Sequence, residues 1–388
     1  MTFPTHGFPS YARQAGLSLV ELMVGMMVGL IGIIIISHLY ITNEQYKRST
    51  TGSGAAQVNG AIALYSLERD LRMAGYGVNN ASALGCACDT AVDPNCSPVQ
   101  YFYNGTYSSP PAAPGSVLRT LQIAPVVIVK TPNQPDSLTL LYSGDNERST
   151  PSKLTQTMSP PNYDYNADGT AGFDLGNSSL IVVTQGTTCV LAQTTVNAAN
   201  SLLVRAPGAY NPVQNGNLHI FSRDAAVITL GQTPVWRTYT IANNRLVSTE
   251  VLPPQGGAGG QALVDDIFDL QALYGKDTGA HAGHVLDDKL VDVYDGVTPT
   301  TAAGWQQVLA VRIAVLARSQ NYEKPTAAGV CTATVAANQP RWGKSAVVPA
   351  GNTFPALAAA LAAAGSEAGC YKYRAFETIV PLRNMIWR

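Results

Sequence analysis

The segment "YDYNADGTAGFD" carries acidic and amide side chains at the spacing of a calcium-binding loop. Its D-x-N-x-D-G core puts hard oxygen ligands on alternate positions and a glycine at the sharp turn. The candidate ligands are Asp164, Asn166, Asp168 and Asp174. Because Leu175 stands where the twelfth-position acid is expected, a hydrated Asn/Asp/Gly turn competes with a structural calcium site as the interpretation. No other cofactor is expected.

Six cysteines provide a second candidate chemistry, and they are Cys86, Cys88, Cys96, Cys189, Cys331 and Cys370. An even number of cysteines beyond an apolar segment is typical of disulfides in an oxidising compartment. The close spacing of the first three also allows a zinc site. We predict disulfides, with Cys331 paired to Cys370 across a C-terminal loop and the remaining pairings open.

No set of residues requires catalysis. A nucleophile elbow, a phosphate-binding loop, a dinucleotide fingerprint and a His-Glu-x-x-His site are all absent from the sequence. His281 and His284, with Asp287 and Asp288, lie in a Gly/Ala-rich setting that favours a solvated loop over a transition-metal site. The formal net charge of -1 gives no reason to expect nucleic acid as a partner. We expect a protein that is not an enzyme.

Glu21 lies near the start of a long apolar run. No charged side chain occurs from Leu22 to Ser37, and the apolar character continues to Ile41. About 20 apolar residues span a bilayer as a helix, so this run is too long for a signal peptide, and no small-x-small cleavage site follows it. An ordinary membrane anchor leaves Glu21 unexplained, because a charge at the membrane centre costs roughly 2.5–3.5 kcal/mol.

The residues "AGLSLVE", Ala15 to Glu21, resemble the processing site of a type IV prepilin. The resemblance implies that a prepilin peptidase cleaves between Gly16 and Leu17 and methylates the Leu17 amine. Glu21 is then the fifth mature residue, which pairs with the amine of a neighbouring subunit. Leu replaces the more usual Phe at the first mature position. Gly25 and Gly29 follow at the small-xxx-small spacing of membrane helix packing.

The helix is expected to continue beyond the membrane. "AAQVNGAIALYSLERDLRMAGYG" repeats apolar residues at three- and four-residue steps, at Val58, Ile62, Leu64, Tyr65, Leu67 and Leu71. Glu68, Arg69, Asp70 and Arg72 provide a polar side, and Gly75 is a C-terminal stop. We expect the apolar side to pack on a globular domain, and the helix to bend or melt at "TTGSG" (50–54).

Beyond residue 77 the chain predicts short strands separated by turns. Such runs include "LQIAPVVIVK", "SLTLLYSG", "SLIVVTQG", "SLLVRAPG", "LHIFSR" and "AVITLG". Asn243-Asn244 separates the two arms of "VWRTYTIANNRLVSTEV", which predicts a hairpin and an antiparallel sheet. The tract 252–260, "LPPQGGAGG", reads as a linker.

The last third resembles the C-terminal signature of PilW-type minor pilins. The resemblance rests on "LVDDIFDLQALYGKD", "WQQVLAVRIAVLARSQ" and "YKYRAFETIVPLRN". It implies an α+β fold in which a long transmembrane and amphipathic N-terminal helix packs on an antiparallel β head. We expect a leader at 1–16, a transmembrane part at 17–41, an amphipathic part at 42–77, and head parts at 78–252 and 261–388.

The resemblance implies a minor pilin that primes assembly of the type IV pilus and sits near its tip, supporting adhesion and twitching. Expected partners are other minor pilins, the major pilin, a tip adhesin, the prepilin peptidase and the inner-membrane assembly machinery. The head is expected in the periplasm before assembly and outside the cell afterwards. The alternatives are a J-like minor pseudopilin of type II secretion and a membrane-tethered periplasmic enzyme or binding protein.

Overall fold

The computed structural model describes residues 16, 18–78, 83–85, 123–144, 150–159, 164–169, 173, 179–185, 188–197, 202–205, 220–251, 260–280, 283–345 and 348–386. The chain divides into two compact units, Met1–Gly52 and Ser53–Arg388. We call the second unit the head. A long apolar N-terminal helix followed by antiparallel sheets confirms the predicted α+β, pilin-like fold.

Helix α1, Leu19–Met73, is the longest element. Ser18 precedes it, and the Ser18 hydroxyl accepts a hydrogen bond from the Glu21 amide at 3.2 Å, as at a helix N-cap. Gly75 follows its end with φ of 80°, the left-handed conformation in which a glycine commonly terminates a helix. The predicted break at 50–54 is wrong, because α1 is continuous there. The helix is long and apolar enough to cross a membrane, and no other described helix is.

The first sheet of the head contains the longest described strand, β14, and has the order β13-β12-β14-β17. Its strands are β12 (Ile267–Lys276), β13 (Val293–Asp295), β14 (Val308–Arg318) and β17 (Tyr373–Pro381). All neighbours pair antiparallel, and β14 is paired with β12 on one side and with β17 on the other from Ala310 to Ala317. Nine of its eleven residues are buried, which is typical of a central strand.

The second sheet has the order β1-β2-β9-β10-β11. Its strands are β1 (Val126–Val129), β2 (Ser137–Tyr142), β9 (Val235–Ala242), β10 (Arg245–Glu250) and β11 (Gln261–Asp265). The hairpin predicted at Asn243-Asn244 is confirmed: β9 and β10 pair directly across this two-residue turn. Both asparagines have positive φ, 51° and 57°, as a tight hairpin turn requires.

A third sheet has the order β3-β8-β5-β6-β7-β4. Its strands are β3 (Ser152–Lys153), β4 (Tyr165–Asn166), β5 (Ser179–Gln185), β6 (Thr188–Asn197), β7 (Leu202–Arg205) and β8 (Ala226–Gly231). The remaining elements are β15 (Arg341–Trp342), β16 (Asn352–Thr353), α3 (Ala302–Gln306), α4 (Pro355–Ala362), a 3-10 turn (Glu367–Cys370) and α5 (Arg383–Ile386).

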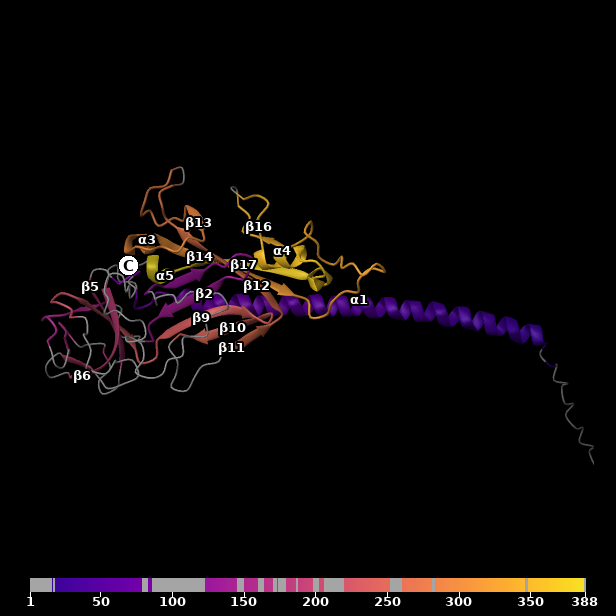
Figure 1. The fold of residues 1–388 in the computed structure, drawn as a ribbon, viewed down its shortest axis with the longest axis horizontal. Coiled ribbons are helices and arrows are strands. Elements are labelled where there is room, and N and C mark those ends of the chain that lie inside the picture. The colour runs from indigo at the N-terminus through magenta and orange to yellow at the C-terminus, as the bar shows by residue number, and fades with distance from the viewer. Residues whose placement is uncertain are drawn as a thin grey trace, which may run out of the picture. The chain divides into compact units, whose positions relative to one another are not determined.

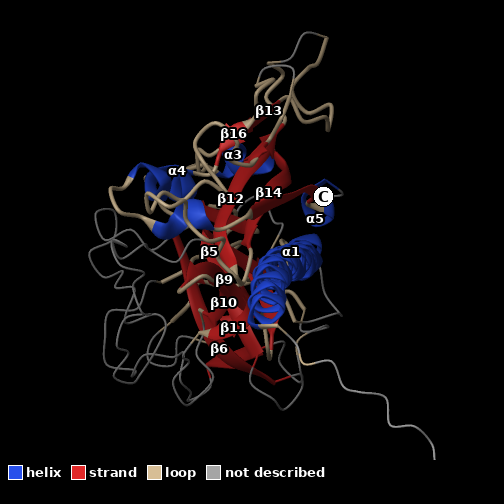
Figure 2. Ribbon diagram, turned by 90° about the vertical axis from the view of Figure 1, so that its right-hand side faces the viewer, coloured by secondary structure: helices blue, strands red, loops and turns tan. Residues whose placement is uncertain are grey.

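The second half of α1 packs on the first two sheets together. Leu67 and Leu71 are fully buried in one cluster with Leu138 and Leu246 of the second sheet and Val311 of the first. Figures 1 and 2 show this part of α1 running along the strands of both sheets. One side of the helix therefore packs against both sheets, and its buried residues belong to the head core.

The strand predictions fail at one place. The run "LHIFSR" includes residues 220–223, which the structure describes as coil and turn. Phe221 is nonetheless buried, in a cluster with Leu154 and Val227. Phe221 is therefore a core residue that lies in a loop, whereas Ile220 is 48% exposed. The predicted linker at 252–260 lies outside the described residues except at Gly260.

Candidate functional site: the N-terminal helix and its attachment to the head

The processing residues lie where α1 begins. Gly16 is exposed, and Leu17 lies outside the described residues. Glu21 is in the first turn of α1, and its side chain is exposed. Among the described residues, no cation forms an ion pair with it. The cleavage and pairing roles of these residues remain predictions.

The apolar run has no packing partner among the described residues of its own unit. Every large apolar side chain from Leu19 to Ile41 is more than half exposed. A Cβ atom added at Gly25 or Gly29 would meet nothing within 4 Å, so neither glycine has a packing role within the described part of the chain. This surface is suited to lipid or to helices of other molecules.

The head fixes α1 through a buried carboxylate. Asp70 is 3% exposed and accepts hydrogen bonds from the Tyr239 hydroxyl at 2.6 Å and from Arg237 Nη1 at 2.7 Å. The Arg69 Nε atom lies 3.3 Å from the other carboxylate oxygen. Arg237 in turn donates to Glu250 at 2.6 Å. The polar side predicted for Glu68–Arg72 is therefore wrong at Asp70, which faces the strands.

The electrostatics hold Tyr239 and Arg237 each in one protonation state. Burial, together with the hydrogen bond donated to Asp70, raises the pKa of Tyr239 well above its ordinary value, so the hydroxyl remains a donor. Hydrogen bonds to Tyr239 and Glu250 outweigh burial and raise the pKa of Arg237, which therefore remains a cation. Charge-assisted hydrogen bonds of this kind are stronger than neutral ones and need specific geometry. The cluster sets the rotation of α1 about its own axis.

A glycine lets α1 approach the first sheet. A Cβ atom added at Gly60 would lie 2.2 Å from the Phe376 ring of β17. Only a residue without a side chain allows this separation between helix and strand. Gly60 was not predicted from the sequence. The signal that could have indicated it is a glycine in the interior of a helix, apart from the small-xxx-small pair Gly25 and Gly29.

The last residues of the chain close the end of α1. Asn384 Nδ2 donates to the backbone carbonyls of Met73 and Ala74, at 3.2 and 3.1 Å. These carbonyls belong to the terminal turn, where a helix leaves acceptors without an intrahelical partner. The Leu-Arg-Asn ending of the PilW-like signature is thus a C-terminal cap supplied from the other end of the chain.

The predicted apolar face of the helix is only partly buried. Leu67 and Leu71 pack in the core, but Val58, Ile62 and Tyr65 are 58%, 48% and 67% exposed. The prediction that all of them face the globular domain is therefore wrong. Helical periodicity places Leu67 and Leu71 about one turn apart on the same side, whereas Val58, Ile62 and Tyr65 follow a different row. The second row is left on the surface of the head.

The Tyr-Gly-x-Asp segment organises the loop between β12 and β13. The Tyr274 hydroxyl, buried, accepts a hydrogen bond from the Ile128 amide at 2.7 Å and so joins the first sheet to the second. The Asp277 carboxylate accepts from the amides of Asp287 and Lys289, at 3.1 and 3.0 Å. Tyr274 therefore joins the two sheets, and Asp277 holds the loop in its conformation.

A second carboxylate holds the start of the same loop. The Asp292 carboxylate accepts from the amides of Thr278 and Gly279 and lies 2.6 Å from His284 Nδ1. Burial opposes ionisation of Asp292, but these hydrogen bonds outweigh it and lower the pKa of its carboxyl below the ordinary value. His281 lies outside the described residues, so the solvated loop remains a prediction at that residue.

The candidate calcium ligands are not gathered into a described site. Asp168 accepts a hydrogen bond from the Lys153 amide at 3.1 Å, and Asn166 lies in β4. Asp164 is half-buried, and Asp174 lies outside the described residues. The described part of the chain contains no cluster of three His, Cys, Asp or Glu side chains suited to a metal. Calcium binding remains a prediction.

One cysteine pair behaves as predicted. Cys331 and Cys370 form a disulfide, with Cα atoms 4.6 Å apart and a sequence separation of 39. Cys189 is also disulfide-bonded, and no described cysteine is free. Cys86, Cys88 and Cys96 lie outside the described residues, so their pairing remains open.

The family comparisons match the two ends of the chain. Residues 11–37 match the model of the prokaryotic N-terminal methylation motif. Residues 237–384 match the model of the type IV pilus-assembly protein W, PilW. No curated protein and no solved structure gives a significant match. The first match contains Gly16 and Glu21, and the second runs from β9 to the Asn384 cap, so the sequence and fold support assignment of the chain as a membrane-anchored, PilW-type minor pilin of the type IV prepilin family.

Proposed function

We propose that this chain is a minor pilin that primes assembly of the type IV pilus and remains at or near the tip, together with other minor pilins. The observation that carries the proposal is Glu21, an exposed carboxylate at the start of an apolar helix surface on which no described residue of its own unit packs. Cleavage after Gly16 would leave the Leu17 amine as a cation on each neighbouring subunit. Pairing of the two charges favours subunits docked in register.

The energetic argument is one of charge burial. An uncompensated charge within a membrane or a helical bundle costs roughly 3–5 kcal/mol once its partner is removed. Glu21 offers such a charge, and the surrounding apolar side chains offer the dry environment that makes pairing necessary. Gly25 and Gly29, with open space around them, allow close approach of neighbouring helices.

The size and build of the head support a place at the tip. The head contains three multistranded sheets beside the second half of α1, a bulk that suits the end of a filament better than a closely repeating shaft. From such a place the subunit would contact the major pilin below it and a tip adhesin above it, and would support adhesion and twitching. These partners follow from the proposed position.

The test compares Glu21→Ala with Glu44→Ala in the native host. Both residues are exposed carboxylates on α1, but Glu44 lies beyond the apolar run. We expect both variants to be processed to a methylated Leu17, and only Glu21→Ala to be depleted from sheared pili and to reduce twitching. Normal incorporation of Glu21→Ala would refute the pairing role. Loss of enzyme secretion with normal twitching would point to a type II pseudopilus, and an uncleaved N-terminus to an ordinary membrane anchor.

A further inference from the structure

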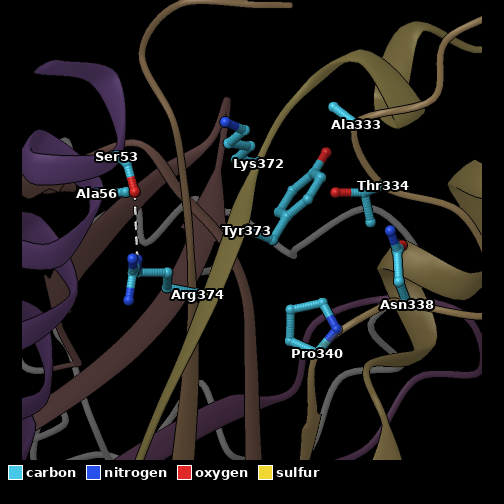
Figure 3. Close-up of a pocket in the computed structure, with 9 residues that line it drawn as sticks. All are labelled: Ser53, Ala56, Ala333, Thr334, Asn338, Pro340, Lys372, Tyr373 and Arg374. Atoms are coloured by element: carbon cyan, nitrogen blue, oxygen red, sulfur yellow. Dashed lines mark hydrogen bonds between the residues drawn. The ribbon is translucent and has the colours of Figure 1, made fainter. Parts of the chain in front are cut away.

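A polar pocket of about 310 Å³ lies in the head, beside the first residues of α1 that belong to this unit. It is lined by Ser53 of α1, by Thr334 and Asn338 of the loop after Cys331, and by Lys372, Tyr373 and Arg374 at the start of β17. Figure 3 shows Arg374 extending toward Ser53 and Tyr373 extending toward Thr334, from opposite faces of the strand. The volume falls at the lower end of the range of small-ligand pockets.

The charge of the pocket is positive. Its lining residues include Lys372 and Arg374 and no acidic residue. Lys372 Nζ lies 3.1 Å from Glu323, which offsets that charge in part. Arg374 donates from Nε to the Ser53 hydroxyl at 3.3 Å, and no carboxylate forms a salt bridge with it in the described part of the chain. The remaining charge is close to one positive unit, carried by a guanidinium.

The far wall of the pocket is fixed in place. The Cys331–Cys370 disulfide ties the loop to the residues just before β17. Thr334 donates from its hydroxyl to the Tyr371 carbonyl at 2.7 Å and from its amide to the Gly369 carbonyl at 2.9 Å. Asn338 Oδ1 accepts a hydrogen bond from the Val335 amide at 2.7 Å. This bond fixes the orientation of the Asn338 side chain.

We propose that this pocket binds a single carboxylate, presented by an acidic side chain of a protein partner. A guanidinium binds planar carboxylates through parallel hydrogen bonds. One net positive charge matches a carboxylate better than a doubly charged phosphate. Because Lys372 is 44% exposed and Arg374 is exposed, a small free acid would remain partly hydrated and bind only weakly, whereas a docked protein would exclude water around the pair and bind its carboxylate more tightly. This inference goes beyond the proposed function and stands whether or not the partner is a pilin.

The test uses the full-length protein in detergent micelles and saturation-transfer NMR of small probes. The probes are N-acetyl-aspartate N-methylamide, which mimics a side chain within a polypeptide, its asparagine analogue, and succinate. We expect saturable millimolar binding of the aspartate probe, a fivefold or greater loss in Arg374→Gln and a smaller loss in Lys372→Gln. The matched control is Arg245→Gln, which removes an exposed arginine on β10 of the second sheet. It should leave binding unchanged.

Three results would overturn the proposal. Equal binding of the asparagine analogue would show that the negative charge is not recognised. Unchanged binding in Arg374→Gln would place the site elsewhere. If succinate bound tenfold more tightly than the aspartate probe, the ligand would be a free dicarboxylate. The proposal of a protein partner would then be refuted. The double variant Cys331→Ala/Cys370→Ala gives a separate check. Loss of the disulfide should make the far wall more mobile and so weaken binding of the aspartate probe.

Discussion

Removal of the Asp70 carboxylate should loosen the attachment of α1 to the head. Asp70→Ala leaves the Tyr239 hydroxyl and Arg237 Nη1 without their acceptor, while Arg237 keeps its bond to Glu250. An orphaned buried donor costs about 1–3 kcal/mol, and a broken buried ion pair about 3–5 kcal/mol. Since Arg237 is about one-quarter exposed and retains one partner, we expect a loss near 3 kcal/mol in the free energy of unfolding.

Urea unfolding of the full-length protein in micelles measures this loss. Trp236, Trp305 and Trp342 are all buried in the head, so the intrinsic fluorescence reports on unfolding of the head as a whole. Tyr239→Phe deletes a single hydroxyl and should cost about 1 kcal/mol. The control Glu68→Ala breaks only an exposed ion pair with Arg72 four residues on, worth roughly 0.3–0.5 kcal/mol.

A double-mutant cycle separates coupling from general damage. If Asp70 and Tyr239 act together, the losses of Asp70→Ala and Tyr239→Phe should combine to less than their sum. Additive losses, or an Asp70→Ala effect as small as that of Glu68→Ala, would refute the view that this cluster fixes the helix.

Three further predictions follow from other contacts. Gly60→Ala should destabilise the head by about 1–3 kcal/mol, because its methyl group would overlap the Phe376 ring, and the urea midpoint checks this. Asn384→Ala should cost about 1 kcal/mol and raise hydrogen exchange in the last turn of α1, while exchange in the first turns stays unchanged. Burial raises the pKa of Asp269 to about 7, so this residue should make the head more stable at pH 5 than at pH 8. The stabilising contribution of protonated Asp269 is complete below about pH 4 and is lost as the pH rises through 7. Asp269→Asn should therefore flatten this part of the plot of unfolding free energy against pH. A profile unchanged by Asp269→Asn would contradict the assignment.

The sequence was sufficient where local chemistry decides structure. Asn243-Asn244 demands a tight turn whatever surrounds it, and the Gly75 stop acts within one helical turn. The N-terminal processing motif and the PilW-like segments are likewise recognisable from the spacing of their own residues, without knowledge of the fold. The Cys331–Cys370 pair was predicted as the C-terminal pair, and the structure confirms it.

It was insufficient where long-range packing decides. Asp70 lies among charged neighbours in the chain, and only the strand that carries Arg237 and Tyr239 makes burial of its carboxylate favourable. Val58 and Ile62 have the periodicity of a core face, yet the two sheets cover a different side of the helix. The carboxylate pocket joins segments more than 300 positions apart, which no local pattern reports.

The cap that Asn384 places on α1 has a consequence for the order of events in the cell. The carbonyls of Met73 and Ala74 receive it from a residue 311 and 310 positions further along the chain. Strand β17, which packs against Gly60, also follows the helix by a long stretch of sequence. Synthesis must therefore pass residue 384 before the helix is capped, and a subunit truncated before Asn384 would hold its N-terminal helix less firmly.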